Sequence, residues 1–431
     1  MKKSRKSFYI LLFFFILQIP AYHLFSQYRF PRPEFKNEYS MPVTPVPRLK
    51  RILILEYLDV VILIISILAA SYLSLKKRSR KYILYLTIFS VLYFGFWKKG
   101  CICPVGSIQN VFLAISNQSY TIPLTAILFF AIPLFATLFF GRTFCAAVCP
   151  LGAVQDLVIF RPVKLPLWLR QILSIIPYAY LGLSLIMVIS GAGFLICRFD
   201  PFVGLFRLSA SFNMFMYGGI LLLAGIFIAR PYCRFLCPYG ALLNLAARFS
   251  RYHITITPDK CINCGLCENS CPFESIDSPV PQTADVPSRY GKKRLGVILL
   301  TTPLIISLFV WAGIVIHPHL AHLHPDVRLA GQIRQEILTE KTGSTLESES
   351  FWQTGETVEE LKQRVKIIQN RFKLNAGMWG GIIGLVLCLK ILSLSVIRKR
   401  KFHEIRQSEC FSCARCVSYC SQERKNYAGK I

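Results

Sequence analysis

The stretch that decides the fold reads Cys261-Ile262-Asn263-Cys264-Gly265-Leu266-Cys267-Glu268-Asn269-Ser270-Cys271-Pro272. Its cysteines are separated by two, two and three residues. This spacing lets three thiolates of one tight loop hold three irons of a [4Fe-4S] cube, while the fourth cysteine turns to a neighbouring cube. A second run with the same spacing occupies Cys410, Cys413, Cys416 and Cys420. Zinc sites use paired Cys-x2-Cys arms, so zinc is the weaker interpretation, and the two runs predict two [4Fe-4S] clusters.

The two cysteine runs are expected to exchange their fourth ligands. We expect one cluster to be held by Cys261, Cys264, Cys267 and Cys420, and the other by Cys410, Cys413, Cys416 and Cys271. Between Cys271 and Cys410 lie 138 residues. The sequence therefore predicts one split, two-cluster α+β domain of the ferredoxin type.

The composition indicates a polytopic membrane protein. Of 431 residues, 54% are hydrophobic although the formal net charge is +28, a combination that is unusual for a soluble chain. The basic residues fall in short clusters beside long apolar runs, which is the pattern of membrane topology and not of a nucleic-acid-binding face. At least eight of the 16 cysteines belong to cluster motifs, which require surroundings that keep thiols reduced. We therefore expect no nucleic-acid partner and no disulfide scaffold.

Eight apolar runs are predicted to span the membrane. They occupy residues 8–25, 52–75, 82–97, 122–140, 167–195, 214–228, 295–316 and 378–396. Lysine and arginine cluster at residues 2–6 and 76–81, so the positive-inside rule places these segments in the cytoplasm. With eight spans, both termini and both cysteine runs also lie there. The expected fold is an all-α, multi-pass protein of the bacterial inner (cytoplasmic) membrane that carries the split ferredoxin-like domain.

The chain divides into five segments. They are residues 1–81 with two spans and an outer loop, 82–245 with a four-helix cysteine-motif core, 246–294 with the first ferredoxin half, 295–397 with two spans around an outer loop at 317–374, and 398–431 with the second ferredoxin half. Within the outer loop, apolar residues recur at helical spacing from Val358 to Ile368, which predicts one amphipathic helix.

The core contains an internal repeat over its four helices. The pattern Arg-x2-Cys-x3-Cys-Pro-x-Gly-Ala recurs after 88 residues, each time after a span that runs from outside to inside. We therefore expect two parallel-topology halves related by an axis along the membrane normal. The inner end would bring together Cys145, Cys149, Cys233 and Cys237. The outer end would gather Cys101, Cys103 and Cys197, with Asp200 as the candidate fourth ligand.

These core cysteines have several interpretations. The inner four could hold a further Fe-S cluster, form a thiol relay or bind copper(I), or they could be small residues that permit close helix packing. An arginine precedes each pair and would hold negative charge nearby, which favours a redox or cofactor role. The outer trio could likewise bind a metal, and its Cys-x-Cys is also a way to bind or relay copper. Cys388 stands alone in the last span and is interpreted as packing.

Four histidines open the outer loop, namely His317, His319, His322 and His324. Neutral imidazole is the commonest metal ligand, so they could bind an outer metal, a haem or a quinone headgroup. Pro318 and Pro325 among them instead favour a plain exit from helix to loop. Both interpretations stay open at this stage.

At these cysteine motifs the chain resembles the membrane polyferredoxins of the NosR and NapH type, which combine paired Cys-x3-Cys-Pro motifs at helix ends with two cytoplasmic [4Fe-4S] motifs. The resemblance covers about half of the chain. It departs from NosR because residues 27–51 are too few for a flavin-binding domain, and from NapH because of the extra outer loop. Cys420 is followed by Ser421 where a proline is usual. The resemblance implies an electron-transfer component of an inner-membrane respiratory or maturation system.

The functional prediction is a transmembrane electron conduit. A cytoplasmic ferredoxin or flavoprotein would reduce the two clusters, and electrons would pass through the inner cysteine site to a quinone or a periplasmic redox partner. Protein groups would orient the clusters and tune their potentials, and the sequence shows no acid-base constellation. The alternative is a copper reductase or metal-site assembly factor, in which the Cys-x3-Cys-Pro thiols bind copper and the clusters reduce it.

Overall fold

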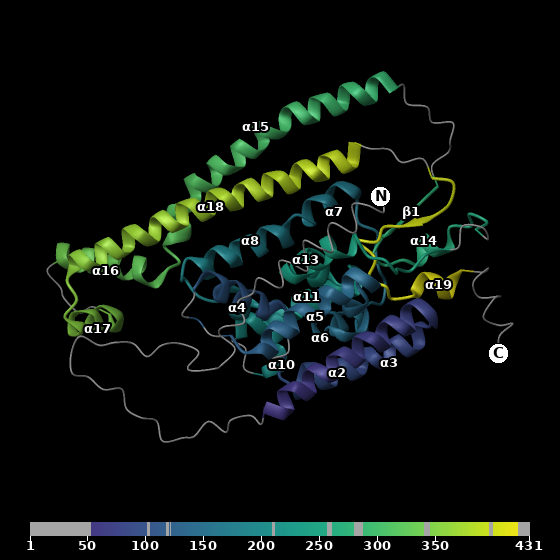
Figure 1. Cartoon of the computed structure of the whole chain (residues 1–431), viewed down its shortest axis with the longest axis horizontal. Helices are drawn as coiled ribbons and strands as arrows, with labels where there is room; N and C mark the ends of the chain where they lie inside the picture. The colour runs from purple at the N-terminus through teal and green to yellow at the C-terminus, as the bar shows by residue number, and fades with distance from the viewer. Residues whose placement is uncertain are drawn as a thin grey trace.

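The computed structural model describes residues 53–100, 104–117, 120, 122–208, 212–256, 261–279, 288–339, 345–395 and 400–420. The predicted first span at 8–25, together with Cys101 and Cys103, lies outside the described residues. The described part is mostly helical, with one two-stranded sheet. Figure 1 shows two long helices along one side of a bundle of shorter ones.

The elements follow in chain order. The first part contains α2 (Leu53–Ser71), the π-helix η2 (Tyr72–Lys76), α3 (Arg80–Ser90), the π-helix η3 (Val91–Trp97), α4 (Pro104–Ser116), α5 (Leu124–Phe140), the π-helix η4 (Phe144–Val148), α6 (Pro150–Leu157), α7 (Leu167–Leu173), α8 (Ile176–Ile189) and α9 (Leu195–Phe199). The second part contains α10 (Pro201–Arg207), α11 (Phe212–Phe227), α12 (Pro231–Phe235), α13 (Pro238–Ala247), α14 (Leu266–Ser270), β1 (Ile276–Asp277), α15 (Ser288–Ala321), α16 (Pro325–Thr339), α17 (Leu346–Thr354), α18 (Val358–Ser395), β2 (Glu404–Ile405) and α19 (Arg415–Tyr419).

Four helical segments are long and apolar enough to cross a membrane. They are Leu55–Lys76, Leu167–Ile189, Lys293–Ala321 and Val358–Ser395, and they coincide with predicted spans at 52–75, 167–195, 295–316 and 378–396. A fifth would arise if α10 and α11, which meet at 110°, count as one span. Helix α5 has 17 residues, or roughly 25 Å at 1.5 Å per residue, against a hydrocarbon core of about 30 Å. The described residues therefore establish four candidate spans, and the count of eight stays a prediction.

Helix α18 joins two elements that the sequence predicts separately. It runs unbroken through the expected amphipathic helix and the last span. A reciprocal cap starts it, because the Glu360 carboxylate accepts from Thr357 N at 3.1 Å while Glu360 N donates to Thr357 Oγ1 at 3.3 Å. No proline follows before its end, so the outer and membrane parts form one continuous helix.

Helices α15 and α18 pack backbone to backbone, side by side in Figure 1. A Cβ added to Gly313 would meet the carbonyl oxygen of Ala376, and one added to Gly380 would meet that of Phe309. Such small-residue contacts are the usual way for helices to associate in lipid, where burying apolar surface gives no gain. The pair matters for the site because the first cysteine run precedes α15 and the second follows α18.

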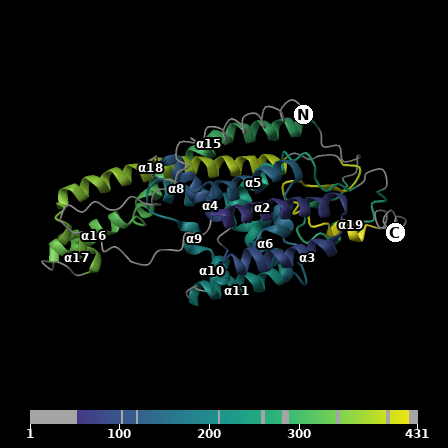
Figure 2. The same ribbon diagram turned by 60° about the horizontal axis from the view of Figure 1, so that its bottom comes forward.

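The two cysteine runs meet at one end of the molecule, opposite α16 and α17 (Figures 1 and 2). Strands β1 and β2 pair antiparallel, with Ile276 opposite Ile405 and Asp277 opposite Glu404. Helix α14 of the first run packs against α19 of the second. Segments far apart in sequence thus form one small α+β unit, as the exchange of ligands requires.

Candidate metal centre

The two Cys-x2-Cys-x2-Cys loops have the same backbone shape. Asn263 and Ser412, at equivalent positions, have φ of 54° and 53°, and Gly265 and Ala414 have φ of 71° and 56°. Left-handed residues at these two positions wrap the chain around a small volume, and the conformation costs a non-glycine residue roughly 1–2 kcal/mol. In the second loop both positions are non-glycine residues, Ser412 and Ala414, and both adopt this conformation. The surroundings of the loop, and not glycine, therefore impose its shape.

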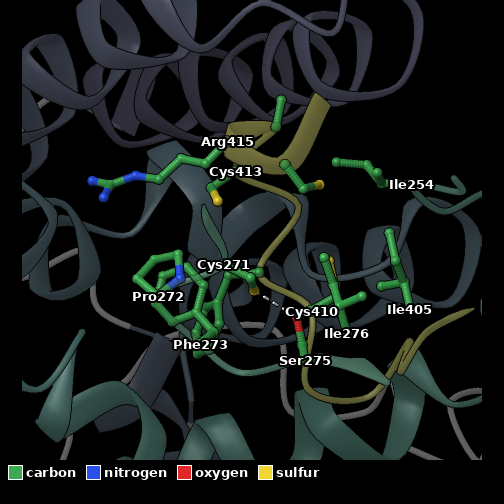
Figure 3. A pocket seen from close by; sticks show the side chains of 13 residues that line it. Ile254, Cys271, Pro272, Phe273, Ser275, Ile276, Ile405, Cys410, Cys413 and Arg415 are labelled. Carbon is green, nitrogen blue, oxygen red and sulfur yellow. Dashed lines mark hydrogen bonds between the residues drawn. The ribbon is translucent and has the colours of Figure 1, made fainter. Parts of the chain in front are cut away.

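Four cysteines of the second ligand set, Cys410, Cys413, Cys416 and Cys271, line one pocket. Its other walls include Ile254, Ile276 and Ile405. In Figure 3 these isoleucines stand on one side, and Cys413 from the second run faces Cys271 from the first. Three thiols of one loop and one thiol from a distant segment, in an apolar pocket, match the donor set of a [4Fe-4S] cube.

Of the pocket cysteines, Cys413 is buried and the other three are half-buried, and their thiols are close enough to repel one another when ionised. Burial raises the pKa of the Cys410 thiol to about 12, against a hydrogen bond from Ser412, and Cys413 and Cys271 add to the rise. Burial and the same neighbours raise the pKa of Cys416 well above its usual value. Such thiols become thiolates only when they bind a cation, so metal binding here releases protons.

The first ligand set, Cys261, Cys264, Cys267 and Cys420, is likewise gathered by the fold. Burial raises the pKa of the Cys267 thiol to about 11, and the Coulomb effects of Cys420, Cys261 and Cys264 add to the rise. This set is nearer the surface, because Cys264 is exposed and Cys261 and Cys420 are half-buried. All eight cysteines of the two sets are free thiols.

Within the described residues, no group of three or more His, Cys, Asp or Glu side chains could hold a single metal ion. A [4Fe-4S] cube requires a different arrangement of ligands. Each thiolate binds a different iron, so the four sulfurs lie farther apart than they would around one ion. The finding therefore bears on the mononuclear alternatives, zinc and copper.

The four inner cysteines are buried at the starts of short helices. Cys149 and Cys237 are the N-caps of α6 and α13, each followed by a proline that suits the first helical turn. The Cys237 sulfur accepts a hydrogen bond from Gly240 N at 3.3 Å. Cys145 lies in η4 and Cys233 in α12, and the Cys233 sulfur accepts from Gln155 Nε2 at 3.4 Å. Their redox or metal role stays a prediction.

The arginine that precedes each inner pair crosses to the opposite half of the core. Arg230 donates to the carbonyls of Cys145 and Ala146, the latter at 2.8 Å. Its Nη1 lies 3.4 Å from where a Cβ of Gly152 would stand. Arg142 similarly lies 3.6 Å from the Cβ position of Gly240. The two glycines of the Pro-x-Gly-Ala motifs thus leave room for the two arginines.

Sequence reasoning missed a buried carboxylate beside Arg230. Asp156 lies in the last turn of α6, and its carboxylate pairs with Arg80, Arg230 and Arg415. Burial alone would raise the pKa of Asp156, but the three guanidinium groups outweigh burial and hold it below its usual value. These partners come from segments far apart in the chain, so no local pattern marks them.

The outer residues are placed only in part. The Cys197 sulfur lies 3.1 Å from the Cβ position of Gly106, three residues after Cys103. Asp200 caps α10, because its Oδ1 accepts from Phe202 N at 3.0 Å and Val203 N at 3.3 Å, and its Oδ2 accepts from Tyr232 at 2.7 Å. Both oxygens are thus engaged, and a ligand role for Asp200 stays a prediction.

The four histidines are not gathered into one centre. His319 and His322 are exposed and His317 is half-buried. His324 is buried, and its Nδ1 accepts from Asp326 N at 3.1 Å at the start of α16. The bonds that the structure gives His324 are those of a helix cap. Cys388, buried in α18, has its sulfur 4.0 Å from Thr302 O on α15, in keeping with packing.

Two family profiles match the chain, both described as a 4Fe-4S binding domain. One covers residues 122–174 and again 211–257, and the other covers residues 254–277. The chain thus carries 4Fe-4S ferredoxin-type domains. No solved structure matches it.

Several curated proteins are similar over parts of the chain. YccM of Escherichia coli K12, named provisionally as an electron transport protein, is 43% identical over 53 residues, which is 12% of this chain and 15% of YccM. The methylamine utilization ferredoxin-type protein MauN of Methylobacillus flagellatus is 30% identical over 129 residues, 26% of this chain and 44% of MauN. The uncharacterized protein MJ0750 of Methanocaldococcus jannaschii is 28% identical over 186 residues, 42% of this chain and 78% of MJ0750. The chain thus covers less than half of each relative that has a functional name.

Proposed function

We propose that this protein is a membrane iron-sulfur electron carrier with two [4Fe-4S] clusters, one in each ligand set. The observation that carries the proposal is the single pocket lined by Cys271 and by three cysteines that lie 138 residues or more further along the chain. The 4Fe-4S profiles and the similarity to electron transport and ferredoxin-type proteins support the same function.

When bound, such clusters accept and release single electrons, and the part of this chain is to hold and insulate them. Ile254, Ile276 and Ile405 exclude water from one side of the second ligand set. Ser412 N and the Ser275 hydroxyl lie 3.4 and 3.3 Å from the sulfurs of Cys410 and Cys271. Hydrogen bonds to sulfur and exclusion of solvent are the levers by which a protein sets a cluster potential.

The finer topology belongs to the same proposal. The repeat of the core is supported by one profile that matches twice, at 122–174 and 211–257, and by the reciprocal crossing of Arg142 and Arg230. We place the cluster unit in the cytoplasm of a bacterium and α16 and α17 outside its inner membrane, because the basic cluster at 76–81 adjoins the cluster end.

The surface around the first ligand set is where an electron donor would dock. Cys264 is exposed, and Ile262 and Tyr419 beside it expose 63% and 62% of their surface. We propose a cytoplasmic ferredoxin or flavoprotein as the donor. The acceptor would be a quinone or a periplasmic redox partner, reached through the inner cysteine site.

The copper alternative has no support among the described residues, since none of their His, Cys, Asp or Glu side chains form a group of three for one ion. It predicts copper and not iron at the core.

Iron and acid-labile sulfide per chain, measured on protein purified without oxygen, test the proposal. We expect about eight of each for two cubes, or more if the core holds another. Cys413→Ser should lower the iron content by up to half, whereas Cys388→Ser, at a buried cysteine of α18, should leave it unchanged. A chain without labile sulfide, or one in which both variants behave alike, would contradict the assignment.

A further inference from the structure

Four arginines gather between the inner cysteines and the second ligand set. We call Arg80, Arg142, Arg230 and Arg415 the arginine layer. Asp156 Oδ1 lies 3.2 Å from Arg230 Nη2 and 3.6 Å from Arg415 Nη2, and Oδ2 pairs with Arg80. The side chains of Asp156 and Arg230 are fully buried, and Arg142 is 4% exposed. One buried carboxylate thus faces three guanidinium groups, of which Arg230 is fully buried while the side chains of Arg80 and Arg415 are 19% and 21% exposed.

The arginine layer contacts the second cysteine loop through two aromatic rings. Phe411 follows Cys410 directly, and its ring centroid lies 4.6 Å from that of Phe273. The guanidinium of Arg142 lies 4.1 Å from the centroid of Phe411, and that of Arg230 lies 5.5 Å from it. Arg142 Nη1 also donates to Ser408 O at 3.4 Å. Positive charge is therefore fixed against the loop that would hold the cluster.

The arginine layer adjoins the second ligand set. Arg415 lies in the same loop, between Cys413 and Cys416, and the guanidinium of Arg142 lies over Phe411, the residue after Cys410. Arg80 and Arg230 join Arg415 through Asp156, which pairs with all three.

Beside the first ligand set, Glu268, which follows Cys267, places a carboxylate 3.5 Å from the imidazole of His403. Near the second ligand set, Glu274 and Glu409 are paired with Arg170 and Arg406, so the arginine layer leaves an excess of positive charge around that set.

An excess of buried positive charge is costly unless an anion compensates it. Among the described residues, Nε of Arg142 and Nε of Arg230 are buried without a hydrogen-bond partner. A cube held by four thiolates is anionic and gains one more negative charge on reduction. The arginine layer therefore stabilises the reduced form more than the oxidised form.

We propose that the arginine layer raises the reduction potential of the cluster in the second ligand set above that of the cluster in the first. This inference rests on the proposed function. One electron from a one-electron donor protein then leaves the surface-side cluster, which is oxidised, and reduces the core-side cluster, with no bond made or broken. Electrons run from the exposed Cys264 side toward Cys413 and the inner cysteines, and Arg230 and Arg142 are positioning residues for that direction.

A redox titration followed by electron paramagnetic resonance tests the direction. Cys413→Ser identifies which signal belongs to the second ligand set. Arg230→Met should lower the ratio of reduced to oxidised cluster in that set at least tenfold at a fixed potential, about 59 mV for a one-electron couple. Asp156→Asn removes the opposing charge and should raise the same ratio. Should Arg230→Met fail to fold, Arg142→Met, outside the Asp156 ion pairs, is expected to shift the ratio in the same direction.

Lys98→Met is the matched control. Lys98 is a buried cation 2.6 Å from Asp59. Asp59 lies 15 residues before Ser74, the residue that contacts the second loop, so it is roughly 20 Å from that loop along the helix. Lys98→Met should therefore leave both reduction potentials unchanged. Shifts of the same sign in Arg230→Met and Asp156→Asn, or a lower potential in the second ligand set than in the first, would overturn the inference while about eight irons per chain still upheld the proposed function. Absence of labile sulfide would overturn both.

Discussion

The contact between α15 and α18 tethers the two halves of the cluster unit, because the first cysteine run precedes α15 and the second follows α18. We predict that Gly380→Ala loosens this contact. The new Cβ would lie against the carbonyl oxygen of Phe309, closer than a Cβ normally approaches any atom. Since that oxygen belongs to the helix backbone, the helices must separate to relieve the clash.

The expected cost follows from two opposing effects. Forcing a methyl group into a filled contact destabilises by about 1–3 kcal/mol. Alanine in place of glycine favours the helix by about 0.5–1 kcal/mol. The net loss for one substitution is therefore up to about 2.5 kcal/mol, and Gly313→Ala, which clashes with Ala376, should add to it.

Thermal loss of the iron-sulfur absorbance in detergent measures this effect. Gly296→Ala is the control, because a Cβ on Gly296 of the same helix pair meets nothing within 4 Å. We expect the control to be as stable as the wild type or slightly more stable, and Gly380→Ala to lose its absorbance at a lower temperature. Equal stability of the two variants would refute the reasoning.

Three further predictions concern charged and capping residues. The pKa of Asp156 is lower in the folded protein than in the unfolded chain. Its ion pairs therefore stabilise the fold above the unfolded-state pKa, and this stabilisation is lost as pH falls through the folded-state pKa. The melting temperature of Asp156→Asn should depend less on pH in that acid range than the melting temperature of the wild type. Glu274 accepts from Arg170 Nη1 at 3.0 Å and from Leu165 N at 3.1 Å, so Glu274→Gln should weaken the docking of the first cysteine run by about 1–3 kcal/mol, seen as faster proteolysis there. Burial lowers the pKa of His324 and keeps its ring neutral, so the ring can cap α16. His324→Ala should lower the free energy of unfolding by about 1 kcal/mol and leave the metal content unchanged. A loss of metal in this variant would show that His324 is a ligand.

Regular spacing is what the sequence made predictable. The two Cys-x2-Cys-x2-Cys-x3-Cys runs predicted which thiols gather, and the structure places Cys271 beside Cys410 across 138 residues. The apolar runs predicted the four candidate spans. Cysteine spacings and apolar runs are local patterns, so a short window of sequence is enough to detect them.

Contacts between distant, unpatterned residues were not predictable. Asp156 meets Arg80 and Arg415, which lie 76 and 259 positions away, so no window of sequence contains the ion pairs. Helix α4 (Pro104–Ser116) buries polar residues such as Gln109, whose side-chain oxygen accepts a hydrogen bond from Ile196 N at 2.9 Å. Hydropathy alone does not predict this helix. The continuous α18 was missed because its polar outer half and apolar inner half have different compositions.

The division of the cluster unit between two distant segments has a consequence for biogenesis. With the proposed ligand sets, the second set has its four thiolates only once Cys416 has been translated, and the first set only once Cys420 has been translated. By that time α15 and α18 have both been synthesised and can pair. The metal centres can therefore be completed only after the preceding helices have been synthesised. A nascent chain that stalls in the membrane before that point holds no finished, oxygen-sensitive cluster.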